Sequence, residues 1–430
     1  MEKTLRRLTY SFFFLLFFII APLLTVYSLG YRYDFDTGNI EKNGAFYIKS
    51  YPRGADIYVD DQKSKRQTPS QVLNIKPGKH KIVVSKNKYV SWQKNLDVSS
   101  GETTFAEDIV LFLENREKTL LGQGSDRFLI NKQKYQYAYI DENKLIITDV
   151  EQGKKFDVFN LEEDFDLVDW SADNQMMLLK NQSEYFYFDI NQKTLTPLLL
   201  DKIQKILWEE NSSTFIYLKD NKLYRKERRE PWDSSAYPDK LLEIDQSIND
   251  FDIEGNWLIV QYTLDKENYI EQFDRYTLES KQFINDASIG NLRILLADNN
   301  YLIFLMGSKL YIKNTFQDLV TIPVTLAELH DERLLLSNGH EIILFDYKNQ
   351  WQSLIDRSSN LVSEIMWHPN GSYFISEIND RTNLIEIDGR DQRNTINLLE
   401  NPRKKMYLFN KKGDRLFILT PEENFYLTIQ

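Results

Sequence analysis

The stretch FLINKQKYQYAYIDENKLIITDVEQGKKFDVF, residues 128–159, decides the fold of the larger part of the chain. It contains four short apolar runs separated by turns rich in Asp, Asn, Gln, Gly and Lys. The runs are Phe128–Ile130, Tyr135–Ile140, Lys144–Thr148 and Phe156–Phe159. Runs of this length between such residues are typical of β-strands. Four strands in a row, joined by tight turns, are the repeating unit of a β-propeller.

Units of the same kind recur along the rest of the chain. They begin near Leu167, Ile206, Phe251, Leu292, Leu326, Ile365 and Tyr407. Their starts are 34 to 45 residues apart, close to the roughly 40–45 residues of a four-stranded blade. Three units share a local signal, because Trp170, Trp208 and Trp367 each precede a polar turn and then an apolar run. The spacing and the turn predict one β-propeller over residues 113–430.

The clearest copy of this turn is Trp367–Gly371, WHPNG, which Ile385–Gly389, IEIDG, follows. These residues resemble the W-S-P-D-G repeat of TolB-like and WD40-like propellers, and the other units match it loosely. The resemblance implies a fold and assigns no ligand. The last unit, Tyr407–Gln430, is one strand short, and Lys118–Leu121 would supply that strand and leave no free sheet edge. We expect eight blades, with seven as the alternative.

A second β-rich stretch, residues 44–112, precedes the repeats. Its predicted strands include Phe46–Ile48, Ile57–Val59 and Ile82–Val84, and its predicted turns include Pro52–Gly54 and Pro77–Gly78. Alternating apolar positions and Gly or Pro at the turns favour a small all-β domain of about seventy residues.

The first turn of this stretch carries a family pattern. Residues 50–60 read SYPRGADIYVD, which resembles the S-x-P-x-G-A-x-I-x-V-D opening of the PEGA domain. The resemblance continues in order through Thr68–Pro69, Ile75–His80 and Tyr89, and covers about a sixth of the chain. It implies a surface-associated β-sandwich that occurs beside membrane anchors. It implies neither an enzyme nor any ligand residue.

Three turn residues depart from the PEGA pattern. Asp61 and Lys88 stand where the family usually has Gly, and Gln67 replaces the Gly before Thr68–Pro69. Gly is favoured where a turn needs a positive φ. We therefore expect altered loop shapes and an unchanged order of strands.

One apolar segment dominates residues 1–31. No charged residue lies between Arg7 and Arg32, and Phe12–Leu24 reads FFFLLFFIIAPLL. This segment is long enough to cross a bilayer as a helix, and the basic residues before it predict a cytoplasmic N-terminus. The alternative is a cleaved signal peptide, which has a shorter apolar core and a small-x-small cleavage site. We expect an uncleaved anchor, a linker at 32–43 and all later residues outside the cytoplasm.

The charge of the chain is unevenly distributed. The whole chain carries 53 Lys and Arg and 64 Asp and Glu, a net charge of −11. Residues 44–99 nevertheless carry eleven basic and four acidic residues, a net of +7. A basic module beside a membrane favours attraction to anionic lipid headgroups or cell-wall polymers, although surface lysines also serve solubility. We expect no nucleic-acid partner.

No motif commits the chain to catalysis, a metal or a cofactor. The chain has no cysteine, which excludes disulfides, thiol chemistry and Cys-ligated metals. The histidines His80, His330, His340 and His368 lack a ligand-like spacing, so we expect them in turns or in solvent. There is no G-x-S-x-G elbow and no P-loop.

Three polar segments are predicted to be turns. Gly122–Gly124 precedes no strand–helix unit and reads as a linker turn. Asp34–Asn39 is similar to a calcium loop but lacks the downstream bidentate Glu. Glu162–Asp166 is an acidic cluster between two repeats, and a solvated turn accounts for it.

The segment Arg225–Lys240, RKERREPWDSSAYPDK, lengthens its repeat and places two aromatic residues between two prolines. Exposed aromatic residues in a semi-rigid loop are suitable anchors for a partner or a sugar ring. Alternatively, both side chains fold back on the propeller. The candidate binding residues are Trp232, Tyr237, Arg228 and Arg229.

These features favour a non-enzymatic, membrane-anchored protein that presents a propeller to a cell-envelope glycan or a surface protein. The alternative is a propeller-type polysaccharide hydrolase or lyase, which requires converging carboxylates or a metal. A sensor role would need a membrane partner, since the predicted cytoplasmic tip is very short. Propellers host many unrelated functions, so the fold does not choose the ligand.

Overall fold

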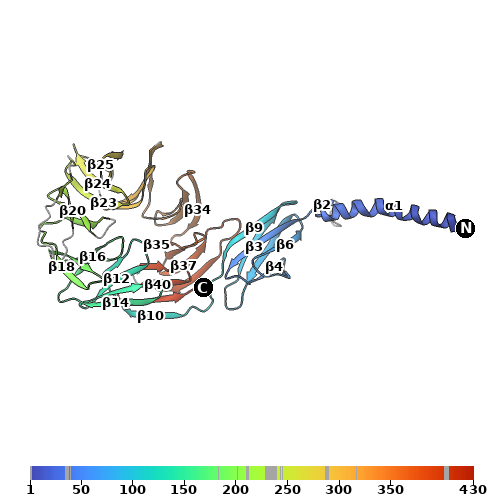
Figure 1. Ribbon diagram of the computed structural model, residues 1–430, viewed down its shortest axis with the longest axis horizontal. Coiled ribbons are helices and arrows are strands. Elements are labelled where there is room, and N and C mark those ends of the chain that lie inside the picture. The colour runs from blue at the N-terminus through green and yellow to red at the C-terminus, as the bar shows by residue number, and fades with distance from the viewer. Residues whose placement is uncertain are drawn as a thin grey trace. The chain divides into compact units, whose positions relative to one another are not determined.

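The computed structural model describes residues 2–33, 38, 40–182, 184–200, 202–209, 213–227, 240–242, 244, 246–285, 290–315, 317–400 and 406–430. The chain divides into two compact units (Figure 1). The small unit comprises Met1–Arg116, Glu386–Asn394 and Gln430, and the large unit comprises Glu117–Ile385 and Thr395–Ile429.

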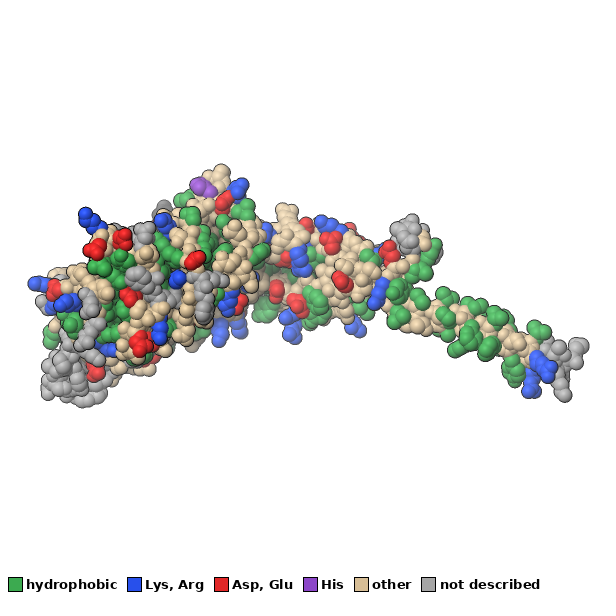
Figure 2. Space-filling model, turned by 90° about the horizontal axis from the view of Figure 1, so that it is seen from above, with side chains coloured by type: hydrophobic (Ala, Val, Ile, Leu, Met, Phe, Trp, Pro, Cys, Tyr) green, Lys and Arg blue, Asp and Glu red, His purple; other side chains and the backbone are tan. Residues whose placement is uncertain are grey.

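The N-terminal element of the small unit is helix α1, Glu2–Ser28. From Arg6 to Ser28 none of the helix is buried, and Figure 2 shows apolar side chains along its length. The helix ends where Gly30 adopts a positive φ of 91°, a conformation that glycine takes without strain. An unburied apolar helix of this length has the properties of a membrane anchor or a signal sequence.

A short antiparallel pair follows the helix. Strands β1, Tyr31–Tyr33, and β2, Ile40–Lys42, pair through Arg32 and Glu41. The Arg32 guanidinium donates to the Tyr27 carbonyl oxygen at 2.7 Å and lies 3.6 Å from the centre of the Tyr27 ring. Arg32 therefore satisfies a carbonyl at the helix end, where backbone acceptors lack partners. Apart from Gly38, the predicted turn Asp34–Asn39 lies outside the described residues.

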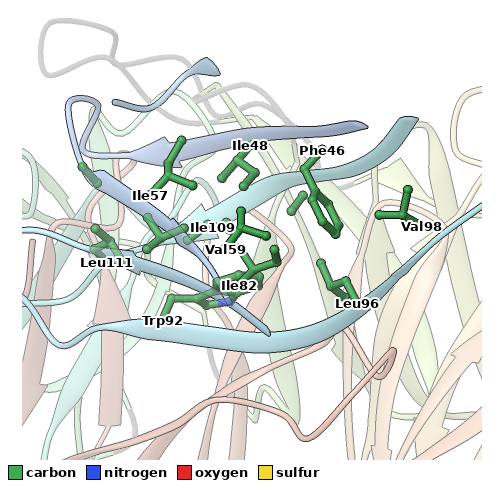
Figure 3. Close-up of a cluster of buried hydrophobic side chains, with 13 residues drawn as sticks. Phe46, Ile48, Ile57, Val59, Ile82, Trp92, Leu96, Val98, Ile109 and Leu111 are labelled. Atoms are coloured by element: carbon green, nitrogen blue, oxygen red, sulfur yellow. The ribbon is translucent and has the colours of Figure 1, made fainter. Parts of the chain in front are cut away.

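The rest of the small unit contains two β-sheets that pack face to face. The first has the order β6, Ser70–Ile75; β3, Gly44–Tyr51; and β9, Thr103–Val110. The second has the order β5, Gln62–Lys63; β4, Asp56–Val59; β7, Gly78–Ser85; and β8, Trp92–Val98. Their facing side chains, including Phe46, Ile48, Ile82 and Trp92, form one buried core (Figure 3). Burial alternates along β8, as expected for a strand with one face on a core.

Two of the departures from the PEGA pattern keep the backbone conformation of a glycine. Asp61 has a φ of 65° and Lys88 a φ of 72°. An L-residue in this left-handed region costs about 1–2 kcal/mol relative to the right-handed one. At these two positions the φ angle therefore stays positive although the side chain has changed. Gln67 does not adopt a positive φ.

The described residues of the large unit form eight four-stranded antiparallel sheets. The first four are β11 Phe128–Ile130, β12 Gln136–Asp141, β13 Lys144–Asp149, β14 Lys154–Asn160; β15 Asp166–Trp170, β16 Met176–Asn181, β17 Glu184–Asp189, β18 Thr194–Pro197; β19 Lys205–Trp208, β20 Thr214–Lys219, β21 Lys222–Glu227, β22 Lys240–Leu241; and β23 Ile248–Glu254, β24 Trp257–Leu264, β25 Glu267–Asp274, β26 Ser280–Ile284. The others are β27 Leu292–Ala297, β28 Tyr301–Met306, β29 Lys309–Asn314, β30 Gln317–Pro323; β31 Leu326–His330, β32 Arg333–Ser337, β33 Glu341–Asp346, β34 Trp351–Arg357; β35 Val362–Trp367, β36 Tyr373–Ile378, β37 Arg381–Glu386, β38 Thr395–Glu400; and β39 Met406–Phe409, β40 Arg415–Leu419, β41 Glu423–Thr428 with β10 Lys118–Gln123.

Apolar side chains join the first six sheets in succession, and the large unit has a propeller-like arrangement (Figure 1). The second strands of the sheets are the most buried, because they face a neighbouring sheet on both sides. One core cluster joins Tyr137 and Tyr139 of the first sheet to Leu408 and Phe417 of the last. The two ends of the repeat region therefore pack together.

The strand expected to complete the last sheet is confirmed, since β10 pairs with β41 and Lys118 stands opposite Leu427. The predicted linker turn at Gly122–Gly124 is wrong for its first two residues, which belong to β10. Their pairing partners lie about 300 residues later in the chain, so local sequence carries no sign of them. A Cβ on Gly124 would lie 2.1 Å from the Thr420 carbonyl oxygen, which explains the glycine there.

Candidate functional site

The sequence-predicted binding residues Trp232, Tyr237, Arg228 and Arg229 lie outside the described residues. The structure places only the base of their segment. Arg225 of β21 pairs with Lys240 of β22, so the segment connects the last two strands of the third sheet. That connection is where a propeller accepts an insertion without disturbing its inner strands.

The first strands of the sheets approach one another inside the large unit. From β11 to β35, each first strand contacts the first strand of the next sheet. Lys134, in the turn after β11, reaches much farther, because its Nζ lies 3.8 Å from Glu328 Oε2 on β31. Lys132 Nζ likewise donates to the Ile253 carbonyl oxygen at the end of β23. Residues from distant repeats thus meet around the first strands, and we take this region as the candidate functional site.

Charged side chains of these strands bind mostly to neighbouring sheets. Lys205 Nζ lies 2.9 Å from Asp250 Oδ1, and Arg293 Nη2 lies 2.5 Å from Glu328 Oε1. The backbone N–H of Trp208 donates to Asp169 Oδ2 at 2.7 Å. These bonds connect sheets that follow one another, so the charges hold first strands together.

Burial changes the acidity of three carboxyl groups here. Burial raises the pKa of Asp169 to about 6, although backbone N–H groups of Trp208 and Trp170 oppose the shift. Burial also raises the pKa of Asp252. The pKa of Glu364 rises to about 7, first through burial and then through repulsion by Glu328 and Glu377. Of Asp169 and Glu364, Glu364 thus has the pKa closer to neutral pH.

Glu377 belongs to a buried hydrogen-bonded chain beside Glu364. Tyr407 Oη donates to Glu377 Oε2 at 2.5 Å, and Tyr407 Oη and Thr382 Oγ1 are 2.8 Å apart. Burial raises the pKa of the Tyr407 hydroxyl, and the bond to Glu377 adds to the shift. The Tyr407 hydroxyl thus orients the Glu377 carboxylate. In the described part of the chain, no three His, Asp or Glu side chains are grouped as a metal site requires.

Sequence reasoning missed Glu328, Glu364 and Glu377. One signal was available, because Glu364 precedes Trp367 by three positions and Lys205 precedes Trp208 by three. Both are charged residues at the same register of a first strand. Such a repeated position indicates a side chain that faces the other first strands rather than an apolar core.

Of the four histidines, His340 is exposed as expected, whereas His80 in β7 and His330 in β31 are half-buried strand residues rather than turn or solvent residues. His80 bonds to Asp60 Oδ2 and to the Lys76 carbonyl oxygen. His330 stacks on Trp367 with 5.3 Å between ring centres. His368 lies in a turn, as predicted, but it is buried, where it contacts Asn370 and the Gly413 carbonyl oxygen. Burial lowers the pKa of His368, which favours the neutral ring at neutral pH.

The acidic cluster Glu162–Asp166 is exposed at both of the residues that pair with Arg127. Arg127 Nη1 lies 2.7 Å from Asp164 Oδ1 and 3.7 Å from Asp166 Oδ1. Glu162–Asp164 are thus an exposed connection, as predicted, whereas Phe165 is buried and Asp166 already belongs to β15. The pairs with Arg127 contribute little stability, because exposed ion pairs are screened by solvent.

The small unit holds a separate, buried polar network. The Glu386 carboxylate accepts from Trp92 Nε1 at 2.8 Å and from Asn394 Nδ2 at 2.8 Å. Lys94 Nζ lies 3.1 Å from the same carboxylate and donates to the Asp388 carbonyl oxygen. The Lys94 side chain is fully buried and that of Glu386 is 5% exposed. With all its groups bonded, this network has a structural role within the small unit.

Comparisons with known proteins agree with the two kinds of β-structure. Residues 43–108 match the model of the PEGA domain, which confirms the resemblance seen at Ser50–Asp60. None of the curated proteins matches the chain in sequence.

Solved structures resemble the chain in fold. A eukaryotic initiation factor is 12% identical with a TM-score of 0.51, and the match covers 86% of this chain and 90% of that one. The Dos1 propeller is 13% identical with a TM-score of 0.49, covering 73% and 93%. The Cps50 (Swd1) propeller domain of Myceliophteria thermophila is 13% identical with a TM-score of 0.40, covering 74% and 99%. At such identities the likeness concerns the fold alone. The chain is a mainly β protein with an apolar N-terminal helix, a PEGA domain and a propeller-like region.

Proposed function

We propose that this protein is a non-enzymatic, membrane-anchored binding or scaffold protein. Helix α1 anchors it with the N-terminus in the cytoplasm, and the large unit is a closed, eight-bladed propeller of the TolB or WD40 kind outside. The observation that carries the proposal is the combination, in one chain, of a PEGA domain at residues 43–108 and a propeller-like region. The partner is an envelope polysaccharide or a surface protein.

The pairing of the inner charges supports a role without catalysis. Lys205, Arg293 and Asp169 each bond to a group of the adjacent sheet. A charge used in this way stabilises the arrangement of strands and is poorly available to a substrate. Binding would then fall to the turns at the faces of the propeller, where loops vary without cost to the core.

Topology can be tested because the chain has no cysteine. A single cysteine at the exposed Lys65 position should react with a membrane-impermeant maleimide in intact cells. A cysteine inserted after Met1 is the matched control and should react only after the membrane is permeabilised. The opposite pattern would overturn the proposed topology.

Binding can be tested with the full-length protein in lipid nanodiscs. We expect it to retain envelope polysaccharide or an envelope protein, and the bound fraction should persist in 0.5 M salt if the propeller is responsible. Binding that disappears with salt would instead assign the interaction to the basic residues of the small unit, because ionic strength screens exposed charges. Failure to retain either class of partner would contradict the proposal.

A polysaccharide hydrolase or lyase is the second candidate, and Glu364 is the observation in its favour. A carboxyl group whose pKa is about 7 suits a general acid at neutral pH. This candidate requires release of reducing ends from a polysaccharide by the wild-type protein and loss of that release in Glu364→Gln. Absence of turnover by the wild-type protein would rule out a hydrolase or lyase function.

A further inference from the structure

Tyr276 is an exposed aromatic residue in the turn between β25 and β26, and its ring is held in place. The side chain is 62% exposed. Arg275 Nη2 donates to Tyr276 Oη, and the guanidinium carbon lies 4.7 Å from the ring centre. The backbone N–H of Tyr276 donates to Asp274 Oδ1 at 3.0 Å. The ring therefore has one side against a cation and the rest open to solvent.

Arg275 itself is one of the most buried residues of the large unit. Its side chain is 2% exposed, and Nε lies 3.5 Å from Glu209 Oε1. Arg225 Nη2 lies 2.9 Å from the same carboxylate and donates to the Arg275 carbonyl oxygen. Among the described residues, Arg275 Nη1 has no hydrogen-bond partner. Two guanidinium groups thus share one buried carboxylate.

Burying a guanidinium costs several kcal/mol before its ion pairs offset the loss of hydration. An apolar side chain at position 275 would fill the same space without that penalty. The Glu209 carboxylate already has the Arg225 guanidinium as a partner at 2.9 Å, so the contact that depends on Arg275 alone is the one to Tyr276, through the ring and its hydroxyl. Arg275 is thus best explained as a residue that positions Tyr276, since a cation is attracted to the face of an aromatic ring.

A polar pocket of 470 Å³ lies beside this turn, lined by residues of the fourth and fifth sheets. It includes Asp274 and Asp298, with Lys281, Asn256, Asn299 and Trp257. Asp274 and Lys281, which line the pocket, flank the turn that carries Tyr276 in the sequence, and the backbone N–H of Arg275 in this turn donates to the Asn256 carbonyl oxygen at 2.9 Å.

Both pocket carboxylates are held by backbone groups. Asp274 Oδ1 accepts from the N–H of Tyr276 and Thr277, and Asp298 Oδ1 accepts from the N–H of Asn300 and Tyr301. Oxygen acceptors in fixed positions suit ligand hydroxyls, and a carboxylate accepts more than two hydrogen bonds. Lys281 and the two asparagines add donors to the same pocket.

This lining selects against simple ions. A cation would meet the Lys281 ammonium, and an anion would meet two carboxylates. A neutral ligand whose hydroxyls both donate and accept matches the mixture of groups. A pyranose ring also has an apolar face that stacks on an aromatic ring.

We propose that Tyr276 and this pocket form a saccharide-binding subsite, in which a pyranose stacks on the open side of Tyr276 and its hydroxyls bond to Asp274 and Asp298. The inference rests on the proposed binding function and names its ligand class and its site. The site includes none of the sequence-predicted residues at 228–237.

Saturation-transfer difference NMR on the full-length protein in nanodiscs tests the proposal, with cellotetraose and chitotetraose as probes. We expect transfer to ring protons of at least one probe and at least tenfold weaker binding in Tyr276→Ala, because this variant removes the aromatic surface on which the pyranose stacks. Tyr276→Trp should bind at least as well as the wild type. Tyr135→Ala, which removes a comparably exposed aromatic side chain elsewhere in the large unit, should bind unchanged.

The role of Arg275 has its own test. Arg275→Met should leave the pocket intact but loosen the ring, so binding should weaken less than in Tyr276→Ala and show no change in its salt dependence. No transfer to either probe, or equal transfer to wild type and Tyr276→Ala, would overturn the subsite. Capture of an envelope protein that depends on Tyr276, without transfer to sugars, would overturn the saccharide class and leave the binding function standing.

Discussion

In the small unit the ion pair of Lys94 and Glu386 is almost completely buried, whereas in the large unit the paired charges of the first strands remain partly exposed. The buried pair has every donor and acceptor bonded. Among the inner carboxyl groups, Glu364 lies beside two other carboxylates and has a raised pKa. The comparison teaches that each unit uses charge differently. The buried pair of the small unit specifies one arrangement, whereas Glu364 of the large unit makes stability depend on pH.

The largest expected effect comes from breaking the buried pair. Glu386→Ala leaves the Lys94 ammonium buried without a partner, which should lower the free energy of unfolding of the small unit by about 3–5 kcal/mol. Hydrogen exchange of the β7 and β8 amides measures this effect. The double variant Lys94→Met, Glu386→Leu should recover most of the loss. Exchange in Glu386→Ala equal to that of the wild type would contradict a specifying role for the pair.

Creating a cavity where the first and last sheets meet should lower the free energy of unfolding almost as much. Phe417→Ala removes a fully buried ring, and we expect a loss of about 3–4 kcal/mol in the unfolding of the large unit, measured by denaturant titration. Phe156→Ala is the matched control, because Phe156 is 55% exposed and its loss should change stability by less than about 0.5 kcal/mol. Similar effects of the two variants would show that the sheets at the two ends do not pack.

The two units should respond to pH in opposite directions. The pKa of Glu364 is raised from 4.5 to about 7, so its stabilising contribution is complete below pH 4.5 and is lost as the pH rises through 7. In the small unit the hydrogen bond with His80 lowers the pKa of Asp60, so that contribution is present above pH 3.8 and is lost as the pH falls below this value.

Glu364→Gln isolates the first of these effects. Relative to the wild type, we expect it to stabilise the large unit by about 1–2 kcal/mol at pH 8, a discounted conversion of the shift, and to have almost no effect at pH 4. Unit-resolved hydrogen exchange, corrected for intrinsic rates, measures both values. A benefit of equal size at both pH values would indicate packing rather than charge.

The smallest expected effect concerns the turn at Lys88. Lys88→Gly relieves the strain of a positive φ of 72° but adds freedom to the unfolded chain, so we expect a net gain of about 0.5 kcal/mol in the small unit. Lys49→Gly, in strand β3, is the control and should cost about 0.5–1 kcal/mol. A loss in Lys88→Gly similar to that in Lys49→Gly would show that the turn does not need the glycine conformation. Thermal unfolding of both variants measures the difference.

Local sequence predicted strands well where strand and turn alternate regularly. The seven later repeat starts, from Leu167 to Tyr407, all lie in the first strands of their sheets. The extension of β10 through Gln123 could not be predicted, because its partner β41 is far away in the chain. The buried pair was also missed, since Lys94 and Glu386 are separated by 292 positions and neither residue type signals burial.

Less of the candidate site than of the fold could be predicted from the sequence. Alternation identifies which residues of a strand share a face, but it does not say which distant strand that face meets. Glu364 acquires its raised pKa from Glu328 and Glu377 on neighbouring strands, after burial. Tyr276 becomes a candidate only because Arg275 is buried beneath it. Both features depend on tertiary contacts that periodicity does not encode.

The pairing of β10 with β41 means that the last sheet of the large unit can form only after the end of the chain has been synthesised. Strand β10 leaves the ribosome before the other strands of the large unit, and its partner follows roughly 300 residues later, which corresponds to about 15–60 s of synthesis. During that interval β10 has an unpaired edge, of the kind that joins other chains. The nascent protein is therefore most prone to aggregation at β10. Chaperones that cover the unpaired edge of this strand would act before the chain is complete.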